Sequence, residues 1–393
     1  MLRARSRGQA GVVSLVMSSD GANIGWDEQG RDSDGAQLEA ILLVGGQGTR
    51  LRPLTIGMPK PLLPTAGVPF LAHQLAKAAA SGVRRVVLAT AFRSEMFAET
   101  FGDGAEYGLE IVYVYEEEPL GTGGGIRNAA ASLHSGPDDP VLVLNGDVLS
   151  GHDIAAQIDM HRKADAAVTL HLVEVPDPAR FGCVPTDFDG RVTAFFEKTP
   201  NPVTSQVNAG CYVFTRRYID AMPAGRVLSV ERETFPALID AGEIVMGYLE
   251  SAYWLDVGTP EAFVRGSCDL VLGELVSPAL PGACGDALLL DDASVDPSAR
   301  VSGGSAVGAG SVIGADATVD GSVLFDGVTI GAGASVVASV VGSGARIGDG
   351  AVLSGAVIGA GADVGGGNEL LSGIRVWPGV RLAGTAIRFS TDA

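Results

Sequence analysis

The chain beyond about residue 280 repeats one simple pattern, and that pattern restricts the possible fold more than any other feature. Aliphatic residues recur at every sixth position, with glycine between them and a few slips of register: Val295, Val301, Val307, Ile313, Val319, Ile330, Val336, Val341, Ile347, Val352, Ile358, Val364, Leu370 and Val376. A six-residue aliphatic period is typical of a parallel β-helix, in which each aliphatic side chain points to the axis of the coil. A disordered segment of the same composition would not keep this phase.

A different pattern occupies residues 38–279. Apolar runs at 41–44, 86–89, 111–115 and 141–144 alternate with helical patterns at 70–81 and 122–133, and two further helical patterns, at 229–240 and 260–272, close the domain. This alternation is typical of a mostly parallel sheet covered by helices. Later runs at 167–173, 192–196, 207–214 and 244–249 alternate more strictly, which indicates an antiparallel extension. We therefore predict an α/β fold, with a Rossmann-like mixed-sheet domain over 38–279 followed by a β-helix over 280–393.

The composition excludes several classes of function. Residues 1–37 mix polar residues and glycine without periodicity, and we expect them to form a disordered tail. Acidic residues outnumber basic ones by 46 to 27, so most of the surface would repel a nucleic acid. No apolar run approaches the roughly 20 residues needed to cross a bilayer. Four scattered cysteines without C-x-x-C spacing predict a protein of the reducing cytoplasm.

A glycine-rich loop follows the first predicted strand. Gly45, Gly46 and Gly48 lie within four positions and leave backbone N–H groups uncovered, so the loop can wrap around an anion such as a triphosphate. Arg50 and Lys60 bring positive charge to the same stretch. The spacing fits neither the dinucleotide-binding fingerprint nor the P-loop. The stretch therefore predicts a phosphate-binding loop of another kind.

Two aspartates are candidates for a metal site. Asp147 ends the strand pattern that runs through 141–144, and Asp256 lies in the segment 253–260. Either aspartate alone is more often a turn or N-cap residue. Mg²⁺ prefers hard oxygen ligands and is commonly held by one or two carboxylates together with phosphate and water. Because ligands of such sheets bind beyond the carboxyl ends of the strands, where the loops at 45–48, 121–125 and 145–147 lie, we predict one cleft.

Two further pairs are candidates for binding a sugar phosphate. Glu197 and Lys198 follow one predicted strand, while Asn208 and Gly210 interrupt the next. The first pair is equally explained as a surface ion pair and the second as a bulge. With a sugar phosphate as ligand, a carboxylate and an amide can bind hydroxyl groups while the ammonium faces the phosphate.

Together these motifs resemble the sugar-1-phosphate nucleotidyltransferases. The resemblance rests on 43–55 with Pro59, Lys60 and Pro61, on 119–124, 145–147, 196–198 and 208–210, and on 254–260. It runs from about residue 38 to the C-terminus and implies that the β-helix is left-handed. Within the family the chain is most similar to members that make GDP-mannose and pyrophosphate from GTP and mannose 1-phosphate with Mg²⁺.

The resemblance also implies roles for individual residues. Catalysis would fall to Arg50, Lys60 and Asp147, and Mg²⁺ to Asp147 and Asp256. The nucleotide would be bound by Leu43, Gly45, Gly46, Gly48, Thr49, Arg50, Lys60 and Gly121. The sugar phosphate would be bound by Gly146, Glu197, Lys198, Asn208 and Gly210. Glu116 and Glu117 are candidates to accept hydrogen bonds from guanine, or form a solvated acidic run.

Three alternatives remain open from the sequence. Glucose-1-phosphate enzymes that use UTP, dTTP or ATP need much the same residues. A non-catalytic regulatory subunit would bind a nucleotide sugar without making one, but such a chain is free to lose Lys60, Asp147 and Asp256, and all three are present. Acyltransfer on a β-helix commonly uses a histidine, and all five histidines precede the repeats. A solenoid with one exposed end also predicts a homo-oligomer.

Overall fold

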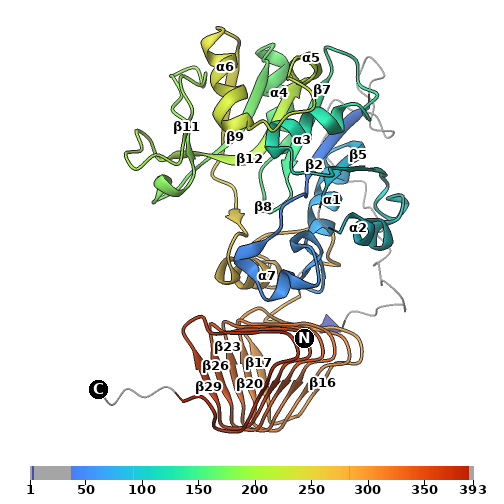
Figure 1. Cartoon of the computed structure of the whole chain (residues 1–393), viewed down its shortest axis with the longest axis vertical. Helices are drawn as coiled ribbons and strands as arrows, with labels where there is room; N and C mark the ends of the chain where they lie inside the picture. Colours follow the sequence, from blue (N-terminus) through green and yellow to red (C-terminus); the bar gives the residue numbers. More distant parts are fainter. Residues whose placement is uncertain (1, 4–36, 92, 283, 389–393) are drawn as a thin grey trace. The chain divides into compact units, whose positions relative to one another are not determined.

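The computed structural model describes residues 2–3, 37–91, 93–282 and 284–388 (Figure 1). Of the predicted tail, Leu2–Arg3 form strand β1, which pairs in parallel with β15 (Ala287–Leu289), and residues 1 and 4–36 lie outside the described residues. The described chain divides into two compact units. The first contains β1, Gln47–His73 and the chain from Leu255 onward, and the second contains residues 37–46 and Gln74–Trp254.

A mixed sheet forms the centre of the second unit. Its parallel part has the order β7 (Pro140–Asn145), β2 (Leu38–Leu43), β5 (Val83–Thr90) and β6 (Glu110–Tyr115). The sheet continues from β7 through β12 (Gln206–Thr215), β10 (Gly182–Cys183) and β11 (Phe196–Glu197), all paired antiparallel. β9 (Val168–Glu174) joins β12 to β13 (Val245–Leu249). The predicted parallel core with an antiparallel extension is confirmed with two corrections: β13 pairs in parallel with β9, and the run 192–196 contributes only its last residue to a strand.

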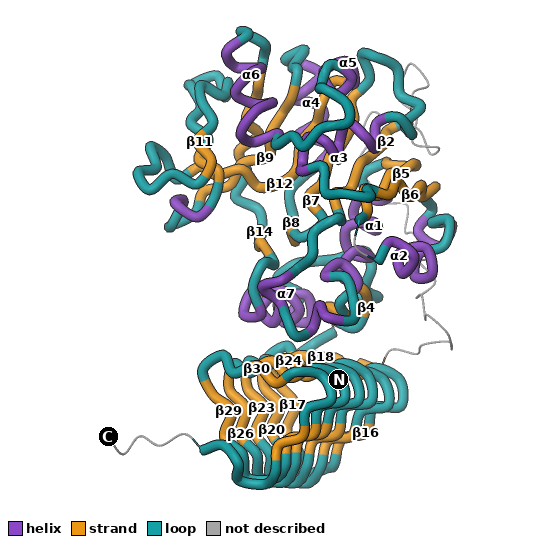
Figure 2. The backbone as a smooth tube through the Cα atoms, in the orientation of Figure 1, coloured by secondary structure: helices purple, strands orange, loops and turns teal. Residues whose placement is uncertain are grey.

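Helices connect and cover these strands (Figure 2). They are α1 (Phe70–Ala80), α2 (Ser94–Phe101), α3 (Gly121–Ala130), α4 (Ile154–Lys163), α5 (Arg216–Asp220), the π-helical turn η6 (Val230–Thr234) and α6 (Phe235–Asp240). The short strands β8 (Val148–Ser150) and β14 (Trp254–Asp256) complete the region. No helix among the described residues is both long and apolar enough to cross a membrane.

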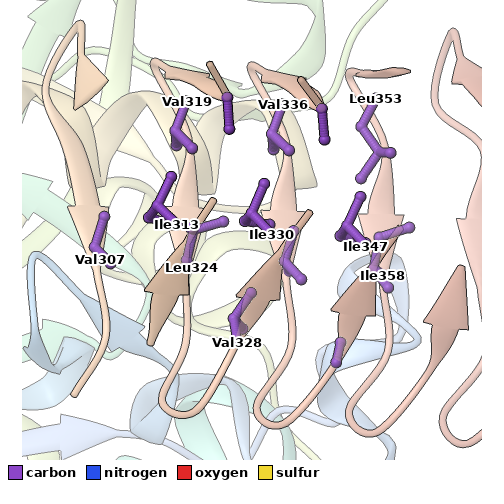
Figure 3. Packing of buried hydrophobic residues seen from close by; sticks show 14 of the residues in the cluster. Val307, Ile313, Val319, Leu324, Val328, Ile330, Val336, Ile347, Leu353 and Ile358 are labelled. Atoms are coloured by element: carbon purple, nitrogen blue, oxygen red, sulfur yellow. The ribbon is translucent and has the colours of Figure 1, made fainter. Parts of the chain in front are cut away.

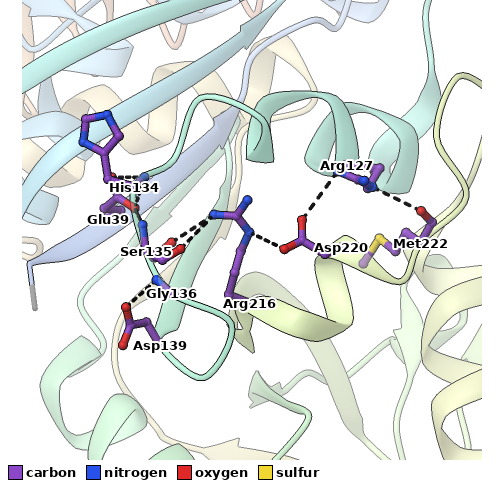
Figure 4. A network of polar contacts seen from close by, with 9 residues as sticks. All are labelled: Glu39, Arg127, His134, Ser135, Gly136, Asp139, Arg216, Asp220 and Met222. Atoms are coloured by element: carbon purple, nitrogen blue, oxygen red, sulfur yellow. Dashed lines mark hydrogen bonds and ion pairs between the residues drawn. The ribbon is translucent and has the colours of Figure 1, made fainter.

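Buried charges tie the loops around α3 and α5 to the start of β2 (Figure 4). Glu39 is 2% exposed, and its carboxylate accepts hydrogen bonds from the backbone N–H groups of His134 and Ser135. Arg216 in turn donates to the carbonyl oxygen of Ser135 and to the Asp220 carboxylate. Because buried carboxylates are costly unless hydrogen-bonded, this network fixes the loop on the sheet.

Four buried histidines should make stability depend on pH, and burial lowers the pKa of one of them, His152, well below its usual value. Burial lowers the pKa of His73 and His161 from 6.5 to about 4, and that of His171 to about 3. Below pH 6.5 the unfolded chain therefore binds more protons than the folded one. We expect the free energy of unfolding to fall as pH decreases toward 4, by up to about 1.4 kcal/mol per pH unit for each histidine.

Urea unfolding between about pH 7 and pH 5 tests this expectation. His171 stacks on His152 with ring centroids 3.8 Å apart, and neither of its ring nitrogens has a hydrogen-bond partner among the described residues. His171→Leu, which removes this group, should reduce the pH dependence. An unfolding midpoint that is constant across this range would contradict the assignment.

The repeat region forms a parallel β-helix whose three sheets lie along the coil (Figure 3). One sheet contains β1, β15, β18 (Ser305–Val307), β21 (Val323–Leu324), β24 (Val340–Val341), β27 (Val357–Ile358) and β30 (Arg375–Val376). The second contains β16 (Ser294–Val295), β19 (Val312–Ile313), β22 (Thr329–Ile330), β25 (Arg346–Ile347), β28 (Asp363–Val364) and β31 (Arg381–Leu382). The third contains β17 (Arg300–Ser302), β20 (Thr318–Asp320), β23 (Ser335–Val337), β26 (Val352–Ser354) and β29 (Glu369–Leu371).

The aliphatic side chains of the hexads fill the interior of this coil, as predicted, with one correction. Val352 is 36% exposed, whereas its neighbour Leu353 is fully buried and stacks in register on Val336. Leu324 supplies the interior residue between Val319 and Ile330, where the sequence pattern slips. The predicted α/β class, with a Rossmann-like mixed-sheet domain followed by a left-handed parallel β-helix, is confirmed.

A column of buried serines links successive coils. The backbone N–H of Ser322 donates to Ser305 Oγ, that of Ser339 to Ser322 Oγ, and that of Ala356 to Ser339 Oγ, each step spanning 17 residues. All three serines are fully buried. Each serine hydroxyl also donates to a backbone carbonyl oxygen of its own coil, so the column leaves no serine hydroxyl unsatisfied.

Helix α7 (Pro260–Leu272) packs on the first coils of the β-helix within the first unit. Thr259 caps its N-terminus by accepting a hydrogen bond from the N–H of Ala262. The rings of Phe263 and Phe325 meet edge to face, with centroids 6.3 Å apart. Ser267 Oγ accepts a hydrogen bond from the N–H of Ala66 at 2.9 Å, which attaches the segment Gln47–His73 to the same unit.

Candidate functional site

The second half of the glycine-rich loop forms a tightly packed turn in the first unit. Gly48 has a φ of 59°, and a Cβ at this position would lie 3.0 Å from the Cβ of Lys60 and 3.1 Å from Thr55 Cγ2. Thr55 Oγ1 donates to the carbonyl oxygen of Gly48 at 2.8 Å. Gly48 is therefore required both by its backbone conformation and by the close approach of Lys60, which is itself 8% exposed.

Arg50 lies against the segment that carries Asp256, also within the first unit. A Cβ on Gly258 would lie 2.6 Å from Arg50 Nη2, so a larger residue there would displace the guanidinium from this position. Arg50 and Thr49 belong to a 3₁₀ turn (Thr49–Leu51) and are exposed, while Asp256 is half-buried. The structure thus places Arg50, a predicted phosphate-binding residue, against Gly258, which is two residues after the predicted metal ligand Asp256.

The first half of the loop belongs to the second unit, beside the turn that carries Asp147. Gly46 is exposed and has open space at its Cβ position, and Gly45 makes only ordinary contacts. Gly146 donates its N–H to the carbonyl oxygen of Leu43 at 2.9 Å, and a Cβ on Gly146 would lie 2.5 Å from that same oxygen. Glycine at position 146 thus allows the turn after β7 to pack directly against the end of β2. It has a structural role beyond the sugar binding expected from the resemblance.

Gln74, which sequence reasoning missed, holds this turn from helix α1. Its Nε2 donates to the carbonyl oxygens of Asn145 at 2.8 Å and of Val148 at 2.9 Å, so one amide bridges the residues that flank Gly146 and Asp147. Gln74 is 8% exposed. Polar residues among the apolar ones of this helix, at His73, Gln74 and Lys77, are the only sequence signal for it.

Four of the residues predicted to bind the sugar phosphate lie on or directly after β11 and on β12 in the same unit. Asn208 uses both ends of its amide internally: Oδ1 accepts from the N–H of Gly210, and Nδ2 donates to the Tyr212 hydroxyl. Gly210 has a φ of 80° at a bulge where β12 shifts register against β9. Glu197 and Lys198 form an ion pair of 3.4 Å in which the Glu197 side chain is 18% exposed. Asn208 therefore braces the bulge.

The glycine run at the start of α3 has a different structural role from the predicted one. A Cβ on Gly121 or Gly123 would lie 2.7 to 2.8 Å from Leu228, and the N–H groups of Gly123 and Gly124 both donate to the Leu228 carbonyl oxygen. These glycines admit the passing backbone of 226–228, a contact between distant segments that no local pattern reveals. Contact of Gly121 with the nucleotide stays a prediction.

Glu116 is buried in the same region and is 8% exposed. Its Oε2 accepts a hydrogen bond from the N–H of Leu120, and a Cβ on Gly125 would lie 2.7 Å from its Oε1. Burial raises the pKa of this carboxyl, against the opposing effect of the Leu120 N–H. Glu116 thus closes the loop before α3, and its predicted contact with guanine remains untested.

The predicted site residues fall into two groups, one in each unit. Gly48, Thr49, Arg50, Lys60 and Asp256 belong to the first unit, and Leu43, Gly45, Gly46, Gly121, Gly146, Asp147, Glu197, Lys198, Asn208 and Gly210 to the second. That all of them line one cleft stays a prediction. In the described part of the chain, no three or more His, Cys, Asp or Glu residues cluster as metal ligands. Two carboxylates with phosphate and water satisfy Mg²⁺ without such a cluster, so the donor set fits a hard divalent cation.

Comparison with known proteins assigns the family. Residues 39–271 match the family model described as nucleotidyl transferase, and residues 283–385 match the model described as GMPPB C-terminal domain. The chain belongs to the nucleotidyl transferase family. This nucleotidyl transferase is 57% identical over 357 residues to the mannose-1-phosphate guanylyltransferase of Mycobacterium tuberculosis, with 91% of this chain and 99% of that protein covered. It is 36% identical to the mannose-1-phosphate guanylyltransferase catalytic subunit beta of Drosophila pseudoobscura, covering 69% and 72%.

Solved structures agree with this family. HddC from Yersinia pseudotuberculosis superposes with a TM-score of 0.52 at 27% identity, covering 59% of this chain and 98% of HddC. HddC complexed with GMP-PN superposes with a TM-score of 0.51. Nucleotidyl transferases of this kind act on a nucleoside triphosphate and a sugar phosphate and generally use a divalent metal. The resemblance inferred from the motifs is therefore confirmed.

Proposed function

We propose that the chain is a mannose-1-phosphate guanylyltransferase, which converts GTP and mannose 1-phosphate into GDP-mannose and pyrophosphate. The observation that carries this proposal is the 57% identity to a mannose-1-phosphate guanylyltransferase over 99% of that protein's length. The relatives named for the same activity at 36% identity support it. The solved complex of HddC with GMP-PN supports a guanine nucleotide as the substrate of this fold.

The reaction needs no general base. An oxygen of the mannose 1-phosphate group is already anionic, and it attacks the α-phosphorus of GTP as the bond between that phosphorus and the bridging oxygen of pyrophosphate breaks. The protein's task is to align the reactants and to neutralise charge. The N–H groups of Gly45, Gly46 and Gly48 bind the triphosphate, while Arg50 takes the departing β- and γ-phosphates and Lys60 the α-phosphate.

The remaining residues hold the cation and the sugar. Asp147 and Asp256 would hold Mg²⁺, which neutralises phosphate charge when bound. Glu197 and Lys198 bind the sugar 1-phosphate together with Gly210. Asn208 contributes by keeping the bulge at Gly210 in shape, since its amide is hydrogen-bonded within β12.

Pyrophosphate release tests the function directly. The purified chain is assayed with GTP, UTP, dTTP and ATP, each against mannose 1-phosphate and glucose 1-phosphate, with Mg²⁺ present. We expect kcat/KM for GTP with mannose 1-phosphate to exceed every other pair by about tenfold or more, the discrimination that a few hydrogen bonds provide. A preference for glucose 1-phosphate would overturn the sugar assignment, and no release from any pair by folded protein would support a non-catalytic role.

The contacts of Gln74 lead to a prediction about metal dependence. Gln74→Leu removes both hydrogen bonds that hold the turn of Asp147. Because Asp147 is proposed to bind the cation, the Mg²⁺ concentration for half-maximal activity should rise by about tenfold, equivalent to about 1.4 kcal/mol. The measurement is a Mg²⁺ titration of pyrophosphate release at saturating substrates.

Gln157 provides a matched control for this titration. It is fully buried, and its Nε2 likewise donates to two carbonyl oxygens, those of Thr169 and Cys211. Gln157→Leu should lower stability by a similar amount and leave the Mg²⁺ dependence unchanged. Equal shifts in both variants would show that Gln74 acts through general stability alone.

We also propose a cytoplasmic, homo-oligomeric enzyme. All four cysteines are free and buried, as expected for a protein that folds in a reducing compartment. The last strands of the β-helix, β29, β30 and β31, each have a sheet partner on one side only among the described residues. Light scattering of the purified chain at several concentrations measures the number of subunits.

A further inference from the structure

One side chain of the β-helix reaches the glycine-rich loop within the first unit. Arg375 begins β30, the last strand of its sheet (Figure 2). Its Nη1 donates to the carbonyl oxygen of Arg50 at 2.9 Å and to that of Arg52 at 2.7 Å. The residues joined by these bonds are 325 and 323 positions apart in the chain. The guanidinium of Arg375 therefore bridges two carbonyls on either side of Leu51.

These two carbonyls flank a residue that anchors the loop in the core. Leu51 is fully buried, and the N–H groups of Leu51 and Arg52 donate to the carbonyl oxygens of Gly48 and Thr49. The Arg50 side chain extends to Gly258, whose missing Cβ leaves room for it. The Leu51 side chain holds the turn on the core side, and Arg375 holds the carbonyl oxygens of Arg50 and Arg52 on the other. Hydrogen bonds in which the donor is charged are stronger than those between neutral groups.

We propose that Arg375 is a positioning residue, through which the β-helix fixes the loop that binds the triphosphate. This inference rests on the proposed function of Arg50. It gives the C-terminal domain a part in substrate binding in addition to assembly. Without Arg375 the carbonyl groups of Arg50 and Arg52 would hydrogen-bond to water. The backbone at Arg50 would then no longer fix the orientation of the Arg50 side chain.

The experiment compares Arg375→Ala with wild-type full-length enzyme. We expect KM for GTP to rise about tenfold, the effect of losing the contribution of one charge-assisted hydrogen bond, while KM for mannose 1-phosphate stays unchanged. Arg375→Lys should give an intermediate KM, because an ammonium has donors for both carbonyls but no fixed fork. Equilibrium binding of the triphosphate without sugar phosphate should weaken by the same factor.

Arg381→Ala is the matched control, since Arg381 is an exposed arginine that begins the next strand, β31. It should match the wild type in both KM values. An unchanged KM for the triphosphate in folded Arg375→Ala, or the same rise in Arg381→Ala, would overturn the inference. Should Arg375→Ala fail to fold, Arg375→Gln, whose side chain is too short to bridge both carbonyls, takes its place.

The proposed function and this inference are judged separately. The comparison uses whichever nucleoside triphosphate the wild-type enzyme accepts, so a wrong assignment of GTP does not affect the ratio between variants. If the wild type releases no pyrophosphate with any triphosphate, the proposed function fails, and equilibrium binding alone then decides whether Arg375 supports the loop.

Discussion

Asp147→Asn should lower the turnover number of pyrophosphate release by about 10²-fold or more, with little change in stability. The asparagine has the same shape as the aspartate but lacks the negative charge that a divalent cation needs. Asp147 is half-buried at the end of β7, on a turn held by Gln74, so the substitution leaves the turn's backbone contacts in place. Lys60→Ala should give a fall of similar size, because the α-phosphate would lose its neutralising charge.

A carboxylate far from the proposed chemistry serves as the control. Asp159 forms an exposed ion pair of 3.8 Å with Lys163 on helix α4. Asp159→Asn should leave turnover unchanged, since exposed pairs of this kind contribute little. Turnover of the Asp147→Asn variant within about threefold of the wild type would remove Asp147 from the catalytic machinery.

Gly146→Ala should destabilise the protein by about 3 kcal/mol, because the added methyl group has no room in the folded chain. The added Cβ would lie 2.5 Å from the carbonyl oxygen of Leu43 and 2.6 Å from Val44 Cγ1. One of these atoms belongs to the backbone of a central strand, which cannot move aside without breaking the sheet. Urea denaturation measures the effect as a shift of the unfolding midpoint.

Substitutions at two other glycines distinguish an effect on stability from an effect on nucleotide binding. Gly57 has a φ of −103° and nothing within 4 Å of its Cβ position, so Gly57→Ala should change stability by about 0.5 kcal/mol at most. Gly46 also has open space at its Cβ position, yet it is proposed to face the triphosphate. Gly46→Ala should therefore fold normally and bind GTP more weakly. A Gly146→Ala variant as stable as Gly57→Ala would contradict the contact with Leu43.

The periodic parts of the fold were predictable, because periodicity reports which side chains are buried. The hexads predicted the β-helix, and the pattern failed only at Val352, where the neighbouring Leu353 takes the interior position. The strand pattern also predicted the order of parallel and antiparallel elements. Helices α2, α4 and α5 were missed.

Contacts between distant segments were not predictable from local patterns. The glycines at 121–124 leave room for the backbone of Leu228, a packing role that their spacing in the sequence does not indicate. Gln74 and Arg375 act through backbone carbonyls, which carry no sequence signature of their own. The motifs therefore identified the residues proposed for chemistry, while the residues that hold those motifs in shape emerged only from the folded chain.

The column of serines inside the β-helix limits how this solenoid can change in length. Ser305, Ser322 and Ser339 each pair with an N–H one complete turn away. An insertion or deletion of a single residue between two of them would leave a serine hydroxyl and a backbone N–H without a hydrogen-bond partner in the apolar interior. It would also move the side chains of the following valines from the interior to the surface. The β-helix should therefore tolerate the gain or loss of whole turns only. A variant that lacks one complete turn should fold, whereas a variant that lacks a single residue should not.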